Sequence, residues 1–202
     1  MLALPSLVKA DYYAEIASFA VLPDTTSITS FGRLEYSDDQ ELGKGVGLTF
    51  GRAFKSPWLL EGQWLYSDST AEGTVAGMGF PMQVNQQLEA NAAFIAILRD
   101  FSLGGSDSKW SLRLGAAMGM VRVRNKAVIS SPVGLTRAAD TDSAGAWQLE
   151  VRAEYAFNDR WKSGLTIRYL NVADLSFASQ GVTQVLRDTR ALLIGPYVQV
   201  AF

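Results

Sequence analysis

The chain of 202 residues contains no cysteine and no histidine. Without cysteine it has no disulfide framework, no zinc–thiolate site and no thiol nucleophile. Without histidine it lacks the side chain that most often serves as a general base near neutral pH. Ser-His and Cys-His catalytic dyads are therefore excluded.

Strong charge of one sign and long apolar runs are missing as well. Eighteen basic residues stand against 20 acidic ones, for a net charge of −2. This balance excludes a nucleic-acid binder that acts through bulk positive charge, because phosphate binding needs clustered Lys and Arg. No apolar run approaches the roughly 18 residues of a transmembrane helix. Apolar residues still make up 48% of the chain, which excludes a disordered protein.

The first ten residues differ from the rest of the chain. Residues 1–10 are mostly apolar, and Val8-Lys9-Ala10 loosely fits a small-residue cleavage signal. We interpret this segment either as the remnant of a signal peptide or as an ordinary leader. A single domain is expected over residues 11–202.

Alternation with period two dominates that domain. Across residues 146–157, apolar and aromatic residues occupy the odd positions, and polar or charged residues occupy most even positions. Such alternation is typical of β-strands with two unlike faces. Eight segments show it, each close to the roughly 9–11 residues with which a tilted strand crosses a bilayer. They are residues 11–21, 45–54, 58–66, 88–101, 110–120, 146–157, 161–169 and 192–202.

Alternation alone does not separate a soluble barrel, with its apolar face inward, from a membrane barrel, with its apolar face on lipid. Aromatic placement favours the membrane barrel. Trp161 and Tyr169 bracket one apolar face, and eight residues of tilted strand rise roughly 20 Å, near the spacing of the two bilayer interfaces. Trp and Tyr prefer those interfaces because the ring enters the acyl region while its polar group reaches water. The predicted aromatic girdle is Trp58, Tyr66, Trp110, Trp147, Tyr155, Trp161 and Tyr169.

The connections between the segments alternate in length. Short turns are expected at residues 54–58 and 157–161, with a somewhat longer one at residues 101–110. The long polar connections are expected near residues 22–44, 68–87, 124–145 and 174–189. Short turns at one end and long loops at the other are typical of outer-membrane barrels. The fold predicted is an all-β, eight-stranded, antiparallel up-and-down transmembrane β-barrel.

The polar faces carry charges of both signs. An eight-stranded barrel is just wide enough for its interior to be filled by side chains, and buried charges are tolerated when they are paired and hydrogen-bonded. We therefore predict an ion-pair network in the lumen. Its predicted members are Glu15, Glu61, Glu89, Arg113, Glu150, Arg152, Glu154, Lys162 and Arg168.

Two other interpretations of the polar faces stay open. Glu150 and Glu154 form a carboxylate pair of the kind used in sugar hydrolysis, although Arg152 between them favours an ion-pair network. The inward face of residues 45–53 is small (Gly, Gly, Thr, Gly and Ala), which leaves room for a narrow pore.

Several segments resemble the OmpA-like and opacity-like family of small outer-membrane β-barrel domains. The matching segments are residues 11–13, 58–63 and 167–175, together with the alternating Ile194, Val198, Val200 and Phe202 at the end of the chain. The resemblance covers residues 11–202 and implies an integral outer-membrane protein in contact with lipid and lipopolysaccharide. It also implies that Val198, Val200 and Phe202 form the signal read by the barrel assembly machinery.

Two features depart from that family pattern. Pro196 lies inside the last predicted strand, where it cannot donate a ladder hydrogen bond, so a bulge or a local loss of pairing is expected. Residues 28–36 also alternate and are expected to form an extra hairpin that extends the first long connection.

The predicted function follows from these expectations. We expect a non-enzymatic outer-membrane barrel with a lumen plugged by side chains, no cofactor and no metal. Its role would be envelope structure, or surface interaction with a host or envelope partner at the loops. A narrow small-solute pore and a soluble, lipocalin-like carrier are the alternatives.

Overall fold

The computed structural model describes residues 12–23, 28–31, 34–37, 39–54, 57–77, 80–104, 108–132, 134–179, 182–186 and 189–202. The predicted leader, residues 1–10, lies outside them. Within the described ranges, no helix is long and apolar enough to cross a membrane. The strands are β1 (Tyr12–Pro23), β2 (Ile28–Phe31), β3 (Leu34–Ser37), β4 (Asp39–Gln40), β5 (Gly43–Ala53), β6 (Trp58–Gly77), β7 (Phe80–Ser102), β8 (Trp110–Ser131), β9 (Gly134–Ala156), β10 (Trp161–Val172), β11 (Leu175–Ser179), β12 (Val182–Leu186) and β13 (Thr189–Ala201).

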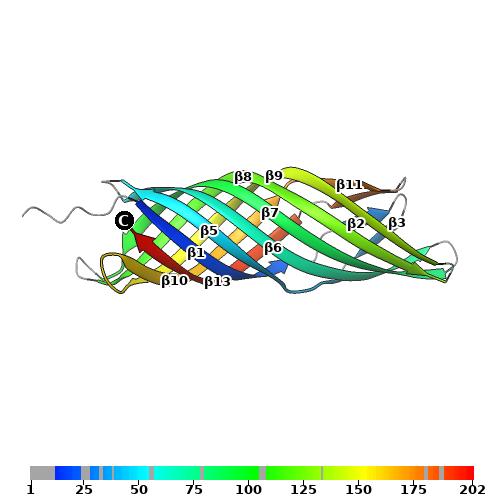
Figure 1. Ribbon diagram of the computed structural model, residues 1–202, viewed down its shortest axis with the longest axis horizontal. Helices are drawn as coiled ribbons and strands as arrows, with labels where there is room; N and C mark the ends of the chain where they lie inside the picture. Colours follow the sequence, from blue (N-terminus) through cyan, green and yellow to red (C-terminus); the bar gives the residue numbers. More distant parts are fainter. Residues whose placement is uncertain are drawn as a thin grey trace, which may run out of the picture.

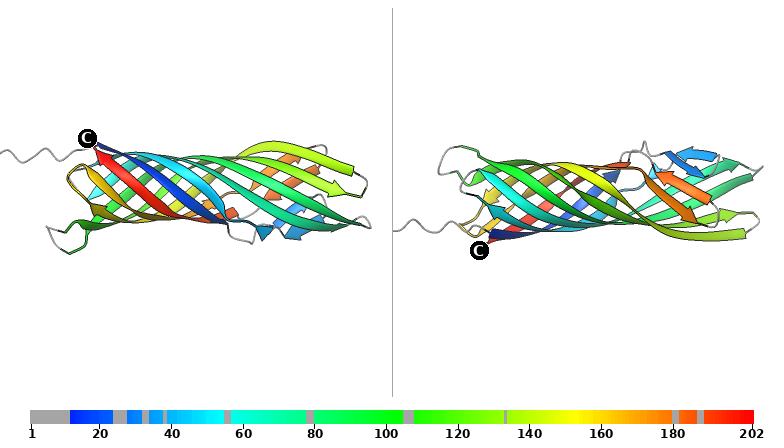
Figure 2. Two further views of the ribbon diagram at one scale, coloured as in Figure 1. Left: turned by 60° about the horizontal axis from the view of Figure 1, so that its bottom comes forward. Right: turned by 90° about the horizontal axis from the view of Figure 1, so that it is seen from above.

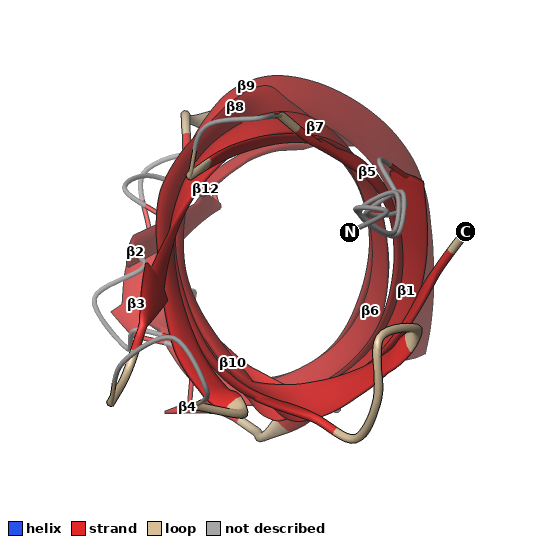
Figure 3. Ribbon diagram, turned by 90° about the vertical axis from the view of Figure 1, so that its left-hand side faces the viewer, coloured by secondary structure: helices blue, strands red, loops and turns tan. Residues whose placement is uncertain are grey.

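Eight strands form a closed ring (Figure 1; Figure 3). Around the ring they run β6-β5-β1-β13-β10-β9-β8-β7, and the β6–β7 pairing closes the circle. Every neighbouring pair is antiparallel, and β1 pairs with β13, so the first and last strands of the barrel meet. The predicted eight-stranded antiparallel up-and-down barrel is confirmed.

The two ends of the barrel differ as predicted. At the end that holds Phe202, the connections are short: Phe157 donates its backbone N–H to the Trp161 carbonyl at 3.0 Å, and Phe54 does the same to Trp58 at 3.1 Å. At the other end, the strands extend into long hairpins (Figure 2). We call these the turn end and the loop end.

Two of the expected long loops are strands instead. The β6–β7 pairing continues without a break to Gly77 opposite Phe80, and the β8–β9 pairing continues to Ser131 opposite Gly134. Residues 68–87 and 124–145 therefore prolong the barrel wall. They looked like loops because both of their faces are mixed in polarity, although backbone pairing needs no apolar face. The predicted strand at residues 88–101 pairs with β6 in one unbroken register as far as Arg99.

A second sheet lies at the loop end. β2 and β3 pair as the hairpin predicted for residues 28–36, with Ile28 opposite Ser37. β12 pairs with both β2 and β11, which gives the order β11-β12-β2-β3. The predicted connections 22–44 and 174–189 thus contain strands that pair directly with each other, β2 with β12.

Pro196 leaves the register of the last strand unchanged. The β1–β13 ladder is in one register from Tyr13 opposite Ala201 to Pro23 opposite Ala191, but Ser18 and Phe19 have no partner in it. The expected local loss of pairing is therefore present and the alternative, a bulge, is not. A Cβ on Gly195 would lie 1.8 Å from the Ser18 carbonyl oxygen, so only glycine fits this close approach of the two strands.

Candidate functional site: the barrel interior and its outer surface

The predicted assignment of the two faces is confirmed. Arg152 and Arg168 are fully buried inside the ring, whereas Trp147 and Leu149 of the neighbouring outward positions are 44% and 52% exposed. All five tryptophans point outward. The inside-polar, outside-apolar arrangement is the reverse of a soluble carrier's.

Arg152 is the centre of the interior. Its guanidinium contacts three carboxylates: Glu15 at 2.8 Å, Glu61 at 2.6 Å and Glu150 at 2.7 Å. These come from β1, β6 and β9, so one side chain ties together opposite parts of the wall. Because each of these groups is almost completely buried, their mutual pairing replaces the hydration that the barrel removes.

Further polar groups complete this central cluster. Arg168 donates from Nε to Glu150 at 2.6 Å, and its Nη2 lies 3.6 Å from Glu15. The Gln63 amide donates to Glu61 at 2.8 Å and to Glu150 at 2.9 Å. Both oxygens of Glu150 accept hydrogen bonds from this cluster. Among the described residues, Glu15 Oε1 and the two Nη atoms of Arg168 are buried without a hydrogen-bond partner.

A second cluster lies nearer the turn end, around Glu154. This carboxylate accepts from Arg113 at 3.0 Å, from Lys162 at 2.7 Å and from the Tyr197 hydroxyl at 3.0 Å. Arg113 also donates to the Gln199 side-chain oxygen at 2.7 Å. The glutamines and tyrosines of both clusters were not predicted, since a neutral residue on a strand's polar face gives no signal of its own.

Eight of the nine residues predicted for the lumen face inward, and Glu89 does not. Glu89 belongs to the outward positions of β7, in line with Asn91, and hydrogen-bonds to Lys126 on the outward face of β8. The Lys126 ammonium holds the pKa of the Glu89 carboxyl below its usual range. The prediction for Glu89 was wrong because, beyond the apolar belt, outward positions of a strand become polar too.

Large side chains occupy the space left by glycines on β5. A Cβ on Gly51 would lie 2.1 Å from the Tyr13 ring, and a Cβ on Gly45 would lie 2.2 Å from Phe19. Both aromatic residues point inward from β1 and are buried. The small inward face of β5, which suggested a pore, is therefore covered by the side chains of Tyr13 and Phe19.

The interior changes character towards the loop end. Buried apolar side chains from most barrel strands and from β11 and β12 pack into one cluster, and its larger part lies above the charged clusters. Its larger members in this region are Phe19, Val21, Leu65, Val121, Val123, Val172, Leu175, Phe177, Leu186 and Leu193. The sequence analysis missed this apolar layer because most of its residues lie beyond the ends of the predicted strands, among them Val121, Val123, Val172, Leu175, Phe177 and Leu186.

The geometry gives the carboxylates no catalytic freedom. Glu150 is held by Arg152 and Arg168, and Glu154 is held by Arg113 and Lys162. A general acid must keep a proton and reach a substrate, whereas these side chains accept hydrogen bonds from cations inside the wall. The arrangement supports a structural role.

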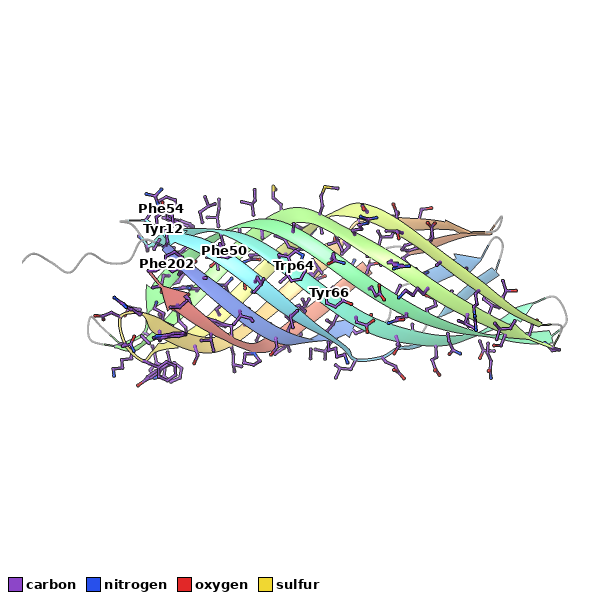
Figure 4. The ribbon with its side chains drawn as sticks, in the orientation of Figure 1. Tyr12, Phe50, Phe54, Trp64, Tyr66 and Phe202 are labelled. Atoms are coloured by element: carbon purple, nitrogen blue, oxygen red, sulfur yellow. The ribbon has the colours of Figure 1, made fainter. Side chains whose placement is uncertain are left out.

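An aromatic residue marks the turn end of every barrel strand on the outside. Predicted members Trp110 and Tyr155 face each other across β8–β9 with ring centroids 5.0 Å apart. Figure 4 shows Tyr12, Phe54 and Phe202 gathered at the same end, and Phe50, Trp64 and Tyr66 following one another towards the loop end. This turn-end ring consists of Tyr12, Phe54, Trp58, Phe101, Trp110, Tyr155, Trp161 and Phe202.

The outer aromatic level is sparser. Trp147 and Tyr169 lie together with ring centroids 5.7 Å apart, and Tyr66 lies on the outward face of β6. Among the described residues, thirty large apolar side chains are exposed, and most of them lie between these two aromatic levels. At the end of β13, Val198 and Phe202 are exposed on one face, with half-buried Val200 between them.

No protein-family model and no curated protein matches the chain. Among solved structures, it is similar to the outer membrane protein OprG from Pseudomonas aeruginosa, with 15% identity over 96% of this chain and 97% of that one, and a TM-score of 0.56. It is similar to the outer membrane protease OmpT from Escherichia coli, with 8% identity over 99% of both chains and a TM-score of 0.54. For Neisserial surface protein A, the identity is 12% over 95% of this chain and 96% of that one, with a TM-score of 0.48.

At such identities the shared property is the fold. The chain has the fold of the small outer-membrane β-barrels: a closed antiparallel ring with short turns at one end and extended hairpins at the other.

Proposed function

We propose that this protein is an integral outer-membrane β-barrel with a plugged lumen, and that it serves envelope structure or surface interaction. The observation that carries the proposal is the outer surface. Ile16, Phe50, Ile95 and Met118 are each at least 60% exposed around the barrel, between the two aromatic levels. In water such a continuous apolar belt would drive aggregation, whereas in a bilayer it faces hydrocarbon.

The aromatic levels support a membrane position with the turn end facing the periplasm. Short periplasmic turns and long extracellular loops are the rule for such barrels. The long hairpins and the second sheet would then stand outside the cell. Loops and hairpins on a rigid scaffold commonly carry binding function, so a host or envelope partner is expected there.

The interior argues for a plug and against transport or hydrolysis. The charged clusters cross the lumen from wall to wall through Arg152, and the apolar layer packs above them. The catalytic activity of the similar protease does not transfer, because only the fold is shared and this chain has no histidine. The face of Val198 and Phe202 is the expected contact for the assembly machinery.

Insertion and conductance together test the proposal. The protein folded into liposomes is expected to float with them in a density gradient and to migrate differently on gels before and after boiling. Its planar-bilayer recordings are expected to lack a steady large conductance. A chain that stays monomeric and soluble without detergent would refute membrane insertion, and a steady large conductance would refute the plugged lumen.

A further inference from the structure

Two arginines on β8 point outward immediately beyond the apolar belt. The outward positions of β8 run from Met118 and Met120, which are 73% and 62% exposed, to exposed Arg122 and Arg124. Met118 pairs across the strands with Trp147 of the outer aromatic level. At about 3.3 Å per residue and a tilt of about 40°, Arg122 lies about 10 Å and Arg124 about 15 Å beyond Met118 along the barrel axis, in the polar region above the hydrocarbon.

These arginines differ from the outward arginines at the turn end. Arg52 lies over the rings of Tyr12 and Phe54, and Arg99 over two further rings, at 5.1–5.8 Å. Within the described residues, neither Arg122 nor Arg124 has such a ring contact or a carboxylate within ion-pair distance. The charge of Arg124 acts on the nearby Glu89 carboxyl, but neither guanidinium is fixed by an ion pair with a described residue, so the hydrogen-bond donors of both can turn towards a ligand.

The nearby carboxylates are already engaged. Glu89 is paired with Lys126. Asp140, which also lies beside the two arginines, accepts a hydrogen bond from the Thr141 backbone N–H at 2.7 Å. Arg122, Arg124 and Lys126 outnumber Glu89 and Asp140 by one charge, so this part of the surface is positive, although the protein as a whole carries a net charge of −2.

A surface depression of about 580 Å³ surrounds the two arginines. It is lined by Glu89, Asn91, Arg122, Arg124, Ala139, Asp140 and Thr141. The Asn91 amide and the Thr141 hydroxyl add neutral hydrogen-bond donors from the two neighbouring strands. Guanidinium forks beside such donors match the geometry of a phosphate group.

We propose that Arg122 and Arg124 bind the phosphate groups of lipid A, the glycolipid anchor of lipopolysaccharide. Along β8, apolar Met118 and Met120 lie where its acyl chains would be, and the two cations follow at the level of its phosphorylated headgroup. This order of apolar and cationic side chains along β8 matches a lipid better than a soluble anion, because a soluble anion would make no contact with the two methionines. The inference rests on the proposed function, since it requires the belt to lie in the outer membrane.

Lipid titrations of full-length protein in detergent, followed by native mass spectrometry, test the site. The variant is R122Q/R124Q, and the matched control is R52Q/R99Q, which removes two outward charges from the opposite end. The probes are bisphosphoryl lipid A, the same lipid after enzymatic removal of both phosphates, and phosphatidylglycerol. Flotation with liposomes checks insertion of each protein separately.

We expect R122Q/R124Q to bind bisphosphoryl lipid A at least tenfold more weakly than the native protein, and R52Q/R99Q to bind within twofold of it. The native protein should bind the dephosphorylated lipid at least tenfold more weakly than bisphosphoryl lipid A. R122Q/R124Q should bind these two lipids with equal affinity. Competition by millimolar inorganic phosphate should leave most lipid bound.

Equal binding by R122Q/R124Q and the native protein would overturn the proposal, as would an equal loss in R52Q/R99Q. An equal loss of phosphatidylglycerol binding would overturn the assignment to lipid A, and full displacement by inorganic phosphate would make the site a simple anion site. If the native protein inserts but shows one of these results, only this inference fails. If it does not insert, the proposed function fails and the inference with it.

Discussion

At the scale of single residues, Arg152 forms more ion pairs than any other described residue of the barrel interior. It is fully buried and contacts carboxylates from β1, β6 and β9. Such a pair is weak evidence of net stability compared with an apolar core, but removing one partner leaves uncompensated charge in the interior. Because three glutamates surround Arg152, the cost of removing this one arginine is much larger than the net stability that its ion pairs contribute.

Replacement of this arginine should therefore destabilise the barrel strongly. For Arg152→Met we expect a loss of about 3–5 kcal/mol in the free energy of unfolding, because Glu15 and Glu61 lose their closest cation. Urea unfolding in lipid vesicles, followed by tryptophan fluorescence, measures it. Arg160→Met, in an exposed turn, is the matched control and should change the free energy little. An equal, small effect of both variants would contradict the role given to Arg152.

The glycines of β5 and β6 provide a second comparison. Gly51→Ala should cost about 1–3 kcal/mol, because the new Cβ would meet the Tyr13 ring at 2.1 Å. Gly62→Ala, on the outward face of β6 with no atom within 4 Å of the new Cβ, should stay within about 0.5 kcal/mol of the native value. The same unfolding assay checks both. A neutral Gly51→Ala would show that the lumen holds free space beside Tyr13.

Some residues were predictable and others were not, for physical reasons. Glu61, Glu150, Arg152 and Arg168 were found because a charge at an inward position of an apolar-alternating strand stands out. Glu89 was misplaced because the alternation rule fails once a strand leaves the bilayer. The glutamines around Glu61 and the phenylalanines of the turn-end ring were not predicted, because their polarity does not differ from that of the other residues on the same strand face.

At the scale of elements, the sequence shows where strands cross the membrane better than where they end. Eight segments were found from alternation, since one face must be apolar there. The sequence predicts loops at the upper parts of β6 to β9, because a hairpin outside the bilayer is held by its backbone hydrogen bonds and needs no alternation of apolar and polar residues. The pairing of β2 with β12 joins segments far apart in the chain, which no local pattern reveals.

The upper hairpin of β8 and β9 should be dispensable for the barrel. Replacing residues 129–136 with Asn-Gly keeps Val128 opposite Arg137 and closes the hairpin with a two-residue turn. We expect the shortened protein to fold and to keep its heat-modifiable migration, because all pairings below Val128 remain. Loss of heat-modifiable migration, with unfolding at the first step of the urea series, would show that the extension is part of the folding unit.

At the scale of the whole molecule, two gradients define the barrel. From inside to outside, the side chains change from paired charges to exposed apolar groups, the reverse of a soluble protein. From turn end to loop end, the inside changes from charged to apolar, while the outside changes from a complete aromatic ring to a sparser level followed by arginines. The first gradient fits a bilayer, because the exposed apolar groups then face hydrocarbon.

Depth-dependent quenching of Trp64 tests this orientation most directly. In a variant that keeps only this tryptophan, with the other four replaced by phenylalanine, the outward indole on β6 is 41% exposed in the belt. In liposomes of lipids brominated in mid-chain, we expect strong quenching of Trp64 fluorescence, and little quenching by acrylamide from the aqueous phase. Fluorescence that acrylamide quenches freely and brominated acyl chains leave unchanged would contradict a hydrocarbon-facing exterior.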